Sequence, residues 1–400
     1  MQPHSIYLHI PFCRHRCSYC DFNTYAGIDD LIPAYIQALC QEIRLLSEKC
    51  DPKPPIQTIF LGGGTPSILP VAEIEKIIYE LNQDFNLLED IEISIEANPG
   101  QLRYDYLKSL YELGINRISL GMQSANPGEL LLLERQHEFH QIANAAGLAR
   151  KAGYKNINFD LIFGIPCQTL ESWRMSLELG LSLEPDHLSL YSLTIEEGTP
   201  LENWVSRGLL SEPDQDLSAD MYELASELLK EHGFEQYEIS NWARRDEVEG
   251  LLTCQHNLQY WHNLPYFGLG AGAHGYTTGK RTVNVRSPSV YTQKMLSMDG
   301  KHKYKNLFFP MTPATASVVK IDRSEEIKET MMMGLRLTEE GISQEGFQSR
   351  FGIPLEDIFE TQINELIDAG LLEKDQSTNY HLRLTPRGRL LGNQVFLRFI

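Results

Sequence analysis

The 400-residue sequence lacks any stretch that is long and apolar enough to span a lipid bilayer. It also lacks the basic segment and apolar run of a secretory signal, because Met1 leads directly into the β-like segment Ser5–Ile10. Hydrophobic residues make up 42% of the chain and charged residues 22%, as in an ordinary soluble globular protein. We therefore expect one barrel-sized domain and a smaller appendage, without a leader or a membrane anchor.

Basic residues are few relative to acidic ones. Lys and Arg together number 35 against 54 Asp and Glu, which gives a formal net charge of −19. Nucleic acid backbones are bound by basic surface, which this chain lacks overall. The charge balance therefore predicts no nucleic-acid partner, although composition alone does not reveal a local basic patch.

The cysteines do not form a disulfide framework. There are seven of them, an odd number, and most lie near one end of the chain. Free thiols persist in a reducing compartment. The cysteine pattern therefore predicts a cytoplasmic protein.

Short β-rich segments alternate with helical patterns over the first half of the sequence. The expected strands are Ser5–Ile10, Gln57–Leu61, Glu92–Glu96, Arg117–Gly121, Asn156–Ile162 and His187–Leu193. The expected helices are Leu31–Leu46, Ala72–Leu81, Arg103–Leu113, Gln141–Ala152 and Leu170–Leu181. Repeated strand–helix units predict an α/β fold, a partial (β/α)6-type TIM barrel with its chemistry at the carboxyl ends of the strands.

The alternation of strand-like and helix-like patterns ends after Gly250. Residues 254–276 are rich in His, Asn, aromatic residues and Gly without a clean period, and residues 277–315 read as irregular. Helical patterns return from Ser324, and a short hairpin near the end predicts a small C-terminal helical, winged-helix-like domain. We expect a barrel over 1–245, a linking segment over 246–320 and the C-terminal domain over 321–400.

Three cysteines lie within eight residues, directly after the first expected strand: Cys13, Cys17 and Cys20. Thiolates at such spacing hold iron–sulfur clusters, and three ligands leave one iron of a [4Fe–4S] cluster open to a small chelating molecule. The alternative is zinc, which requires a fourth ligand such as His15. The other cysteines are scattered without a second close pair, so we favour the cluster.

The segment Cys13–Cys20 resembles the signature of the radical S-adenosylmethionine (SAM) superfamily, with the aromatic Tyr19 before the third cysteine. In that superfamily the open iron chelates SAM, and the reduced cluster cleaves it to a 5′-deoxyadenosyl radical. The resemblance extends to the glycine run after the second strand, where Gly63, Gly64 and Thr65 correspond to the segment that meets the amino group of SAM. Taken alone, the run is equally typical of a tight turn.

Further motifs follow in the order of this superfamily. By resemblance, Glu96, Gln123 and Asp160 are polar contacts to SAM, Arg135 neutralises its carboxylate, and Tyr7 and Tyr19 flank it. Taken singly, each is more typical of a strand-end hydrogen bond or a solvated charge. Cys167 departs from the pattern, because relatives commonly carry glycine there.

Together these motifs resemble the oxygen-independent coproporphyrinogen III oxidase family over nearly the whole chain. Its two branches are the decarboxylating oxidase and a heme chaperone. Phe22 stands where the oxidase carries a further cysteine, and only Met1–His4 precede the first strand, where the oxidase has an extension. Both features favour the chaperone branch.

The chaperone branch has a His-Asn-x-x-Tyr-Trp motif associated with heme binding, which His256, Asn257, Tyr260 and Trp261 resemble. Imidazole is a common axial ligand of heme iron, and aromatic faces suit a macrocycle. Cys254 and His262 are alternative ligands. On spacing alone, the segment is more typical of an imidazole and an amide that bond loop backbone while the aromatic residues fill a core.

The resemblance implies a heme-binding radical SAM protein that delivers heme to hemoproteins such as respiratory cytochromes, with the cluster and SAM in support. The alternatives are decarboxylation of coproporphyrinogen III and, more distantly, radical modification of RNA, which the acidic balance disfavours. Whether SAM is cleaved is not evident from the sequence, and a homodimer is compatible with it.

Overall fold

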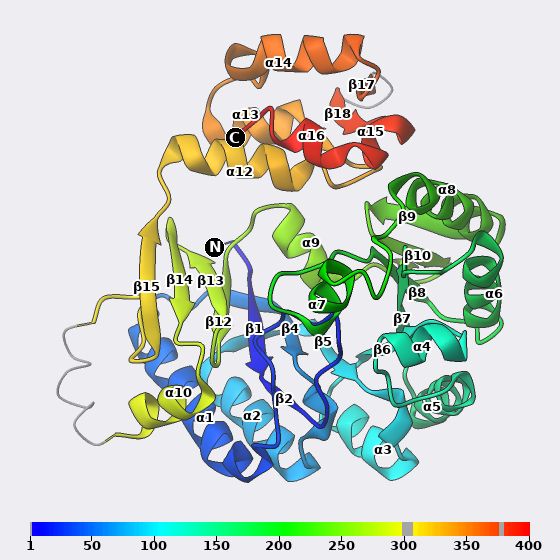
Figure 1. Cartoon of the computed structure of the whole chain (residues 1–400). Coiled ribbons are helices and arrows are strands. Elements are labelled where there is room, and N and C mark those ends of the chain that lie inside the picture. The colour runs from blue at the N-terminus through cyan, green and yellow to red at the C-terminus, as the bar shows by residue number, and fades with distance from the viewer. Residues whose placement is uncertain (1, 298–306, 376–379) are drawn as a thin grey trace. The chain divides into compact units, whose positions relative to one another are not determined.

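The computed structural model describes residues 2–297, 307–375 and 380–400, which form two compact units (Figure 1). The first, the barrel unit, comprises Met1–Ala225 and Pro265–Lys320. The second, the C-terminal unit, comprises Ser226–Leu264 and Ile321–Ile400. Each unit is therefore built from two stretches of chain that are far apart in sequence.

A curved parallel sheet forms the centre of the barrel unit. Its strands follow the spatial order β8-β7-β6-β5-β4-β1-β12, and each neighbouring pair is parallel. Their bounds are β1 His4–Ile10, β4 Pro55–Gly63, β5 Asn86–Ala97, β6 Arg117–Gln123, β7 Asn156–Phe163, β8 His187–Ser192 and β12 Tyr266–Leu269. The six strands expected from the sequence are present, and the prediction of a partial barrel is confirmed.

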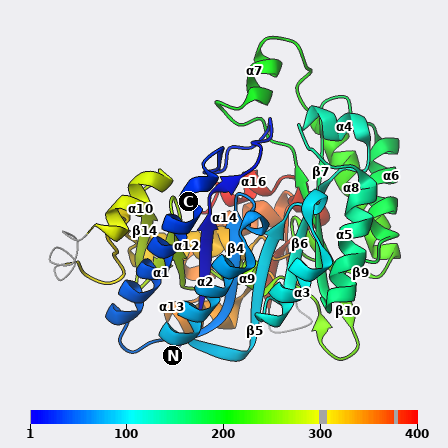
Figure 2. The same cartoon turned by 90° about the horizontal axis from the view of Figure 1, so that it is seen from below.

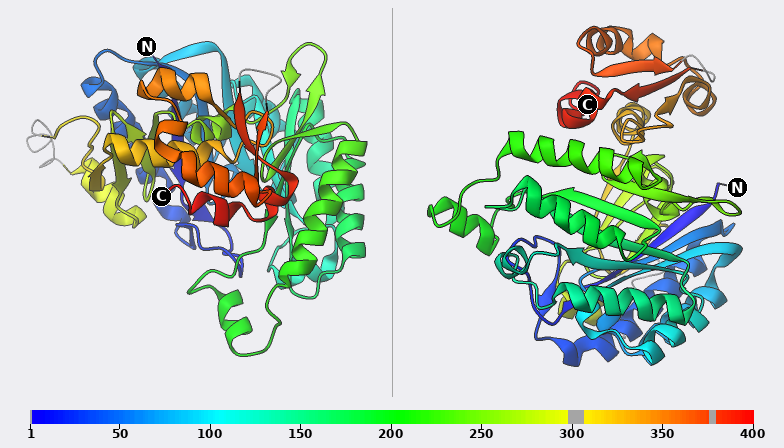
Figure 3. Two further views of the ribbon diagram at one scale, coloured as in Figure 1. Left: turned by 90° about the horizontal axis from the view of Figure 1, so that it is seen from above. Right: turned by 90° about the vertical axis from the view of Figure 1, so that its right-hand side faces the viewer.

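The connecting helices cover one face of this sheet. They are α1 Ile32–Lys49, α2 Val71–Asp84, α3 Tyr104–Glu112, α4 Pro127–Leu132, α5 Phe139–Ala152, α6 Leu170–Leu181, α7 Pro200–Ser206 and α8 Gln215–Glu231. Helix α1 buries Ile36, Leu39, Ile43 and Leu46, which recur every three or four residues and so share one side of the helix. Figures 2 and 3 show most of these helices side by side along the sheet, whereas α7 projects away from it beyond the strand ends. Because the apolar sides of the helices pack against the face of the sheet, the carboxyl ends of the strands are left open.

An antiparallel extension continues the sheet beyond β12. It consists of β13 His274–Thr277, β14 Lys280–Asn284 and β15 Thr315–Lys320, with helix α10 Pro288–Leu296 between the last two strands. The expectation of irregular structure over residues 277–315 is wrong for β14 and α10. These strands are short, and their pairing partners lie elsewhere in the fold, so the local pattern carried little signal.

A buried carboxylate joins helix α1 to this extension. Glu42 is fully buried and accepts hydrogen bonds from the backbone nitrogen of Gly270 at 2.8 Å and from Asn284 Nδ2 at 2.8 Å. The hydroxyls of Tyr291 and Thr312 also donate to it, each at 2.7 Å. Since four donors meet one carboxylate away from water, the group fixes the extension to the barrel.

We expect Glu42→Ala to lower the free energy of unfolding by roughly 3 kcal/mol, because it leaves buried donors without an acceptor. Chemical denaturation monitored by circular dichroism measures this. Glu48→Ala, on the exposed side of the same helix, is the control and should change stability little. Equal stability of the two variants would contradict a structural role for Glu42.

The C-terminal unit contains a helical module with a small sheet. Helices α12 Arg323–Gly334, α13 Gln344–Phe351 and α14 Glu356–Asp368 precede the hairpin of β17 Leu372–Asp375 and β18 His381–Leu384. Strand β16 Ile342–Ser343 pairs with β18, and helices α15 Pro386–Leu390 and α16 Gly392–Phe396 follow. Their apolar side chains form one core, which includes Met331, Leu335, Phe347 and Ile363. The predicted C-terminal helical domain is confirmed.

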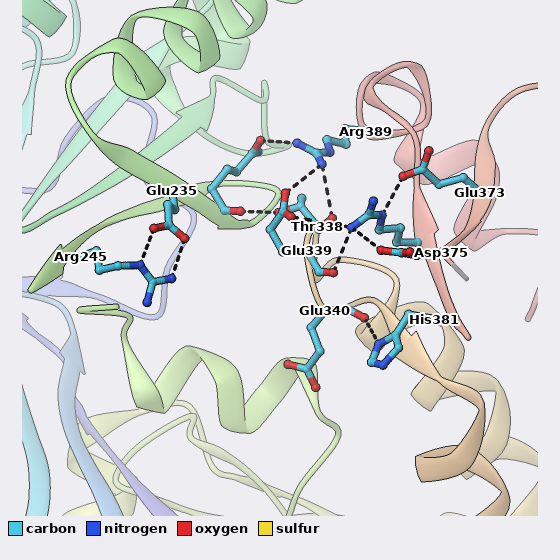
Figure 4. Close-up of polar contacts among 11 residues, drawn as sticks. Glu235, Arg245, Thr338, Glu339, Glu340, Glu373, Asp375, His381 and Arg389 are labelled. Atoms are coloured by element: carbon cyan, nitrogen blue, oxygen red, sulfur yellow. Dashed lines mark hydrogen bonds and ion pairs between the residues drawn. The ribbon is translucent and has the colours of Figure 1, made fainter. Parts of the chain in front are cut away.

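The same unit includes β9 Phe234–Glu238, β10 Asn241–Asp246, β11 Gly250–Leu251 and helix α9 Gln255–Trp261. Polar contacts tie β9 to the C-terminal module (Figure 4). Thr338 Oγ1 donates to the carbonyl of Gln236 at 2.7 Å, and Arg389 Nη1 donates to Gln236 Oε1 at 2.9 Å. No helix among the described residues has the length and apolar character required to cross a membrane.

Candidate functional site

A cavity of about 520 Å³ lies at the carboxyl ends of the parallel strands in the barrel unit. Most of the residues that the sequence predicted as cofactor contacts line it. They are Cys13, Cys17, Tyr19, Cys20, Gly63, Gly64, Thr65, Glu96, Gln123, Arg135 and Asp160. Parallel strands bring these residues together because each strand ends at the same edge of the sheet.

The three cysteines lie on a loop that follows β1 and passes through the short strand β2, Phe12–Cys13. Thr65 Oγ1 lies 3.6 Å from Cys13 Sγ, and Arg135 Nη1 lies 3.6 Å from Cys17 Sγ. Burial raises the pKa of the Cys13 thiol to about 11, although its contact with Thr65 lowers it. A thiol in these surroundings becomes a thiolate ligand only when a metal centre compensates its charge, and the cavity offers the three sulfurs to one such centre.

The zinc alternative required a fourth ligand close to the cysteines. Among residues 2–297, 307–375 and 380–400, no group of His, Cys, Asp and Glu side chains is arranged to hold a single metal ion. In a four-iron cluster each thiolate binds a different iron, so its ligands need not converge on one point. His15 instead contacts a carboxylate, since its Nε2 lies 3.5 Å from Glu134 Oε2.

The glycine run after β4 closes over the cysteine loop. Gly63 has a φ of +108°, and a Cβ there would lie 2.4 Å from the ring of His9. The backbone nitrogen of Gly64 donates to the carbonyl of Ile10 at 2.8 Å. Only glycine meets both the dihedral and the close approach, so the run is more than an ordinary turn.

Two half-buried carboxylates, Glu96 and Asp160, face the cavity, and the charge of Arg117 favours the ionised form of each. Gly63 N donates to Glu96 Oε2 at 2.9 Å, while Ser119 Oγ and Asn158 Nδ2 donate to Asp160 at 2.6 and 2.9 Å. Burial, followed by the charge of Asp160, raises the pKa of Glu96 to about 7. A positively charged ligand would stabilise both ionised carboxylates, and SAM carries a sulfonium.

Arg135 provides the opposite charge in the same cavity. Its Nη2 donates to the carbonyl of Gly121 at 3.0 Å, while its Nε is buried and has no hydrogen-bond partner in the described part of the chain. Gln123, the last residue of β6, has a left-handed backbone conformation with a φ of 62°. A buried guanidinium with an unused donor suits a carboxylate-bearing ligand.

Tyr7 is the predicted SAM contact that does not line this cavity. Its hydroxyl lies 3.0 Å from His9 Nδ1, and His9 Nε2 lies 3.0 Å from the carbonyl of Asn23. Sequence reasoning missed His9, which packs behind Gly63 and connects β1 to the chain that follows the cysteine loop. Its sole signal was its place two residues after Tyr7 on the same face of the strand.

The predicted heme motif lies in the C-terminal unit. Residues 254–276 showed no clean period, yet Gln255–Trp261 forms helix α9, so the helix was missed. His256 is buried, its Nε2 lies 3.0 Å from the Tyr260 hydroxyl, and the two rings are perpendicular. The imidazole thus contacts a side chain of the motif itself.

The end of the motif is held by the turn segment that follows helix α12 in the same unit. The guanidinium of Arg336 lies 4.4 Å from the ring centre of Trp261, and His262 Nε2 lies 3.0 Å from Glu340 Oε2. Trp261 Nε1 is buried and has no hydrogen-bond partner within the described residues. Cys254, the other alternative ligand, is buried at the start of the helix. The motif is therefore well packed, and its ligand assignments stay predictions.

A parallel sheet of strand–helix units, with three cysteines after its first strand and a charged cavity at the strand ends, defines a radical SAM protein. Residues 7–180 match the Radical SAM superfamily, and residues 321–391 match the HemN C-terminal domain. The chain is 38% identical to heme chaperone HemW of Bacillus subtilis, over 99% of both chains. It is 36% identical to heme chaperone HemW of Lactococcus lactis, over 100% of this chain and 98% of the relative. The chain therefore belongs to the HemW family of radical SAM proteins.

The family extends beyond bacteria, since the mouse mitochondrial radical S-adenosyl methionine domain-containing protein 1 is 34% identical over 93% of this chain and 82% of its own. Among solved structures, coproporphyrinogen III oxidase (HemN) from Escherichia coli superposes with a TM-score of 0.82. That match covers 100% of this chain and 90% of HemN at 23% identity, and it confirms the fold alone.

We expect Arg135→Ala to weaken SAM binding by about tenfold or more, because a partly buried carboxylate loses its charge partner. Equilibrium dialysis with the anaerobically reconstituted protein measures the affinity. Arg174→Ala is the matched control, since Arg174 forms only an exposed ion pair with Glu178. Unchanged SAM affinity in both variants would show that Arg135 does not contact SAM.

SAM affinity should rise between about pH 6 and about pH 8, because Glu96 loses its proton over this range and its carboxylate then attracts the sulfonium. Glu96→Gln should remove most of this rise. Calorimetric titration at several pH values measures both profiles, and any ionisation of SAM itself is common to them. Glu89→Gln, at an exposed position of the same strand, should retain the rise. Superimposable profiles for Glu96→Gln and the parent would exclude this role of Glu96.

Proposed function

We propose that this protein binds heme and delivers it to hemoproteins such as respiratory cytochromes. The observation that carries the proposal is the likeness to proteins named heme chaperone HemW along nearly the whole chain. Both units are included in that likeness, so the proposal draws on the cysteine cavity and on the motif of helix α9 alike.

A [4Fe–4S] cluster on Cys13, Cys17 and Cys20, with SAM at its open iron, supports this activity. The cavity geometry favours these cofactors, because three sulfurs, two half-buried carboxylates and an arginine with an unused donor line one space. The cluster supplies an electron when SAM is bound. Glu96 and Asp160 balance the sulfonium, and Arg135 balances the carboxylate.

Decarboxylation of coproporphyrinogen III is the less favoured activity. Phe22, in the place of the oxidase's further cysteine, lines the cavity with 66% of its surface exposed. A phenyl ring at this wall offers no thiol chemistry to a substrate. The exposed ring instead suits contact with an apolar surface.

We place the protein in the cytoplasm, because exposed iron–sulfur clusters and free thiols persist in a reducing compartment. Heme and the recipient hemoproteins are its partners. The net charge of −19 weighs against a nucleic-acid partner.

His256 is the proposed iron ligand within the α9 motif. Its Nε2 faces the Tyr260 hydroxyl at 3.0 Å, so iron binding through Nε2 would replace this contact with a bond to the metal. Tyr260 and Trp261 then offer aromatic faces to the macrocycle. Asn257 lies one residue after the ligand on the same short helix.

We expect the anaerobically reconstituted protein to bind about four irons and to bind heme with a Soret band distinct from that of free heme. Supplied with SAM and reductant, it should not form protoporphyrinogen IX from coproporphyrinogen III. Iron and sulfide analysis, heme titration and product chromatography measure these properties. His256→Ala should shift or weaken the Soret band.

Three variants serve as controls. Cys17→Ser should lose the irons, while Cys254→Ser and His262→Ala test the neighbouring ligands. Heme binding by the parent no stronger than by an unrelated protein would end the chaperone proposal. Rapid formation of protoporphyrinogen IX would favour the oxidase activity instead.

A further inference from the structure

A second, largely apolar pocket of about 600 Å³, which is wide open to solvent, lies in the barrel unit beside the cysteine loop. Its apolar walls are Leu131 and Leu132 at the end of α4, and Trp204, Leu209 and Leu210 from α7 and the chain after it. His15, Glu134, Arg135 and Gln136 line both this cavity and the one that holds the cysteines. We call the second cavity the apolar pocket; a ligand in it touches the cysteine loop directly.

Ser18, a buried residue of the cysteine loop, holds the walls of the apolar pocket together. Its hydroxyl donates to the carbonyl of Leu132 at 3.0 Å, and its carbonyl accepts from the backbone nitrogen of Leu201 at 3.0 Å. Helices α4 and α7 therefore meet the loop at a single residue, and Figures 1 and 2 both show α7 next to this loop. Ser18 thus links both walls of the pocket to the cysteine loop.

The wall of the apolar pocket contains both leucines that pack against the core and leucines that are exposed to solvent. Leu132, Trp204 and Leu210 pack against a buried apolar cluster beneath the pocket. Leu131 and Leu209, in contrast, are 78% and 61% exposed. Exposed leucines that line a cavity of this size are typical of a binding site for a large apolar ligand.

His15 presents an imidazole at the edge of the pocket. Its side chain is 41% exposed, and the contact of its Nε2 with Glu134 at 3.5 Å is the sole polar contact of the ring among the described residues. A carboxylate behind one ring nitrogen directs the other, here Nδ1, toward a metal, as in many metal-binding histidines. The ring is therefore available to a metal-containing ligand.

Two cations flank this imidazole in sequence. Arg14 and Arg16 are exposed and line the neighbouring cavity, and Arg16 Nη2 donates to the carbonyl of Cys20 at 3.0 Å. Cations at this loop stand out in a chain with a net charge of −19. They complement a ligand that carries carboxylates at its rim.

We propose that the apolar pocket binds an iron tetrapyrrole, with His15 Nδ1 as ligand to the iron, the leucines and Trp204 against its face, and Arg14 and Arg16 near its carboxylates. The inference rests on the proposed heme function and places a heme-contact site next to the cysteine loop. This site differs from the α9 motif, which lies in the other unit. Heme in the apolar pocket touches the same loop that holds the cysteines.

The test compares heme titrations of the full-length, cluster-containing protein with those of two variants. Leu131→Asp/Leu209→Asp places carboxylates where the macrocycle would lie and should lower heme affinity by about tenfold or more. Since both leucines are exposed, this variant should fold and keep its irons. Added to a His256→Ala background, His15→Ala should remove the imidazole-ligated ferric heme signal that remains in the electron paramagnetic resonance spectrum.

Matched controls isolate the pocket from general surface effects. Val248→Asp changes an apolar side chain that is 92% exposed and does not line the pocket. His140→Ala removes another exposed histidine with a carboxylate partner, Glu138, at 3.3 Å. Both controls should bind heme as the parent does.

The outcomes separate this inference from the proposed function. Weaker binding in the leucine variant, with loss of the remaining imidazole signal when His15→Ala is added to His256→Ala, supports the apolar pocket. If both variants match the parent while His256→Ala loses heme, the pocket proposal is wrong and the chaperone function stands. If the parent itself binds no heme, both are wrong. Should His15→Ala lose its irons, the leucine variant alone decides.

Discussion

Strands β1 and β4 run parallel with Ile10 opposite Gly63, and their pairing continues past the strand ends. There the nitrogen of Gly64 bonds to the carbonyl of Ile10, and that of Thr65 to the carbonyl of Phe12, each at 2.8 Å. This backbone contact brings the glycine run over the cysteine loop. The remaining features of the cavity depend on it, because Cys13 and the glutamate that Gly63 contacts reach the same space only in this register.

Charge inside the cavity is balanced only in part by the protein itself. The charge of Asp160 raises the cost of ionising Glu96, while Arg135 retains a buried donor that has no hydrogen-bond partner within the described residues. Burial disfavours ionised thiols as well. A site of this kind is completed by cofactors that carry both signs of charge, as a metal cluster with SAM does.

The cysteine loop lies between two pockets and contributes residues to both. One side of it faces the charged cavity, and the other, through His15, faces the apolar pocket between α4 and α7. Ser18 fixes both helices to this loop. A cofactor site and an apolar ligand site can therefore influence each other through a few residues of backbone, without a long path of coupled side chains.

The sequence by itself determined the strand–helix alternation, the cysteine spacing and the family motifs, because these depend on local periodicity and residue chemistry. Most predicted SAM contacts accordingly line one cavity, although Tyr7 does not. Tertiary structure alone decided the pairing of β14, the burial of Glu42 among four donors, and the helix around His256. Each depends on partners distant in the chain, and a short segment shows no pattern that reveals its partner. The apolar pocket has the same origin, since its walls come from three separate segments that meet only in the folded chain.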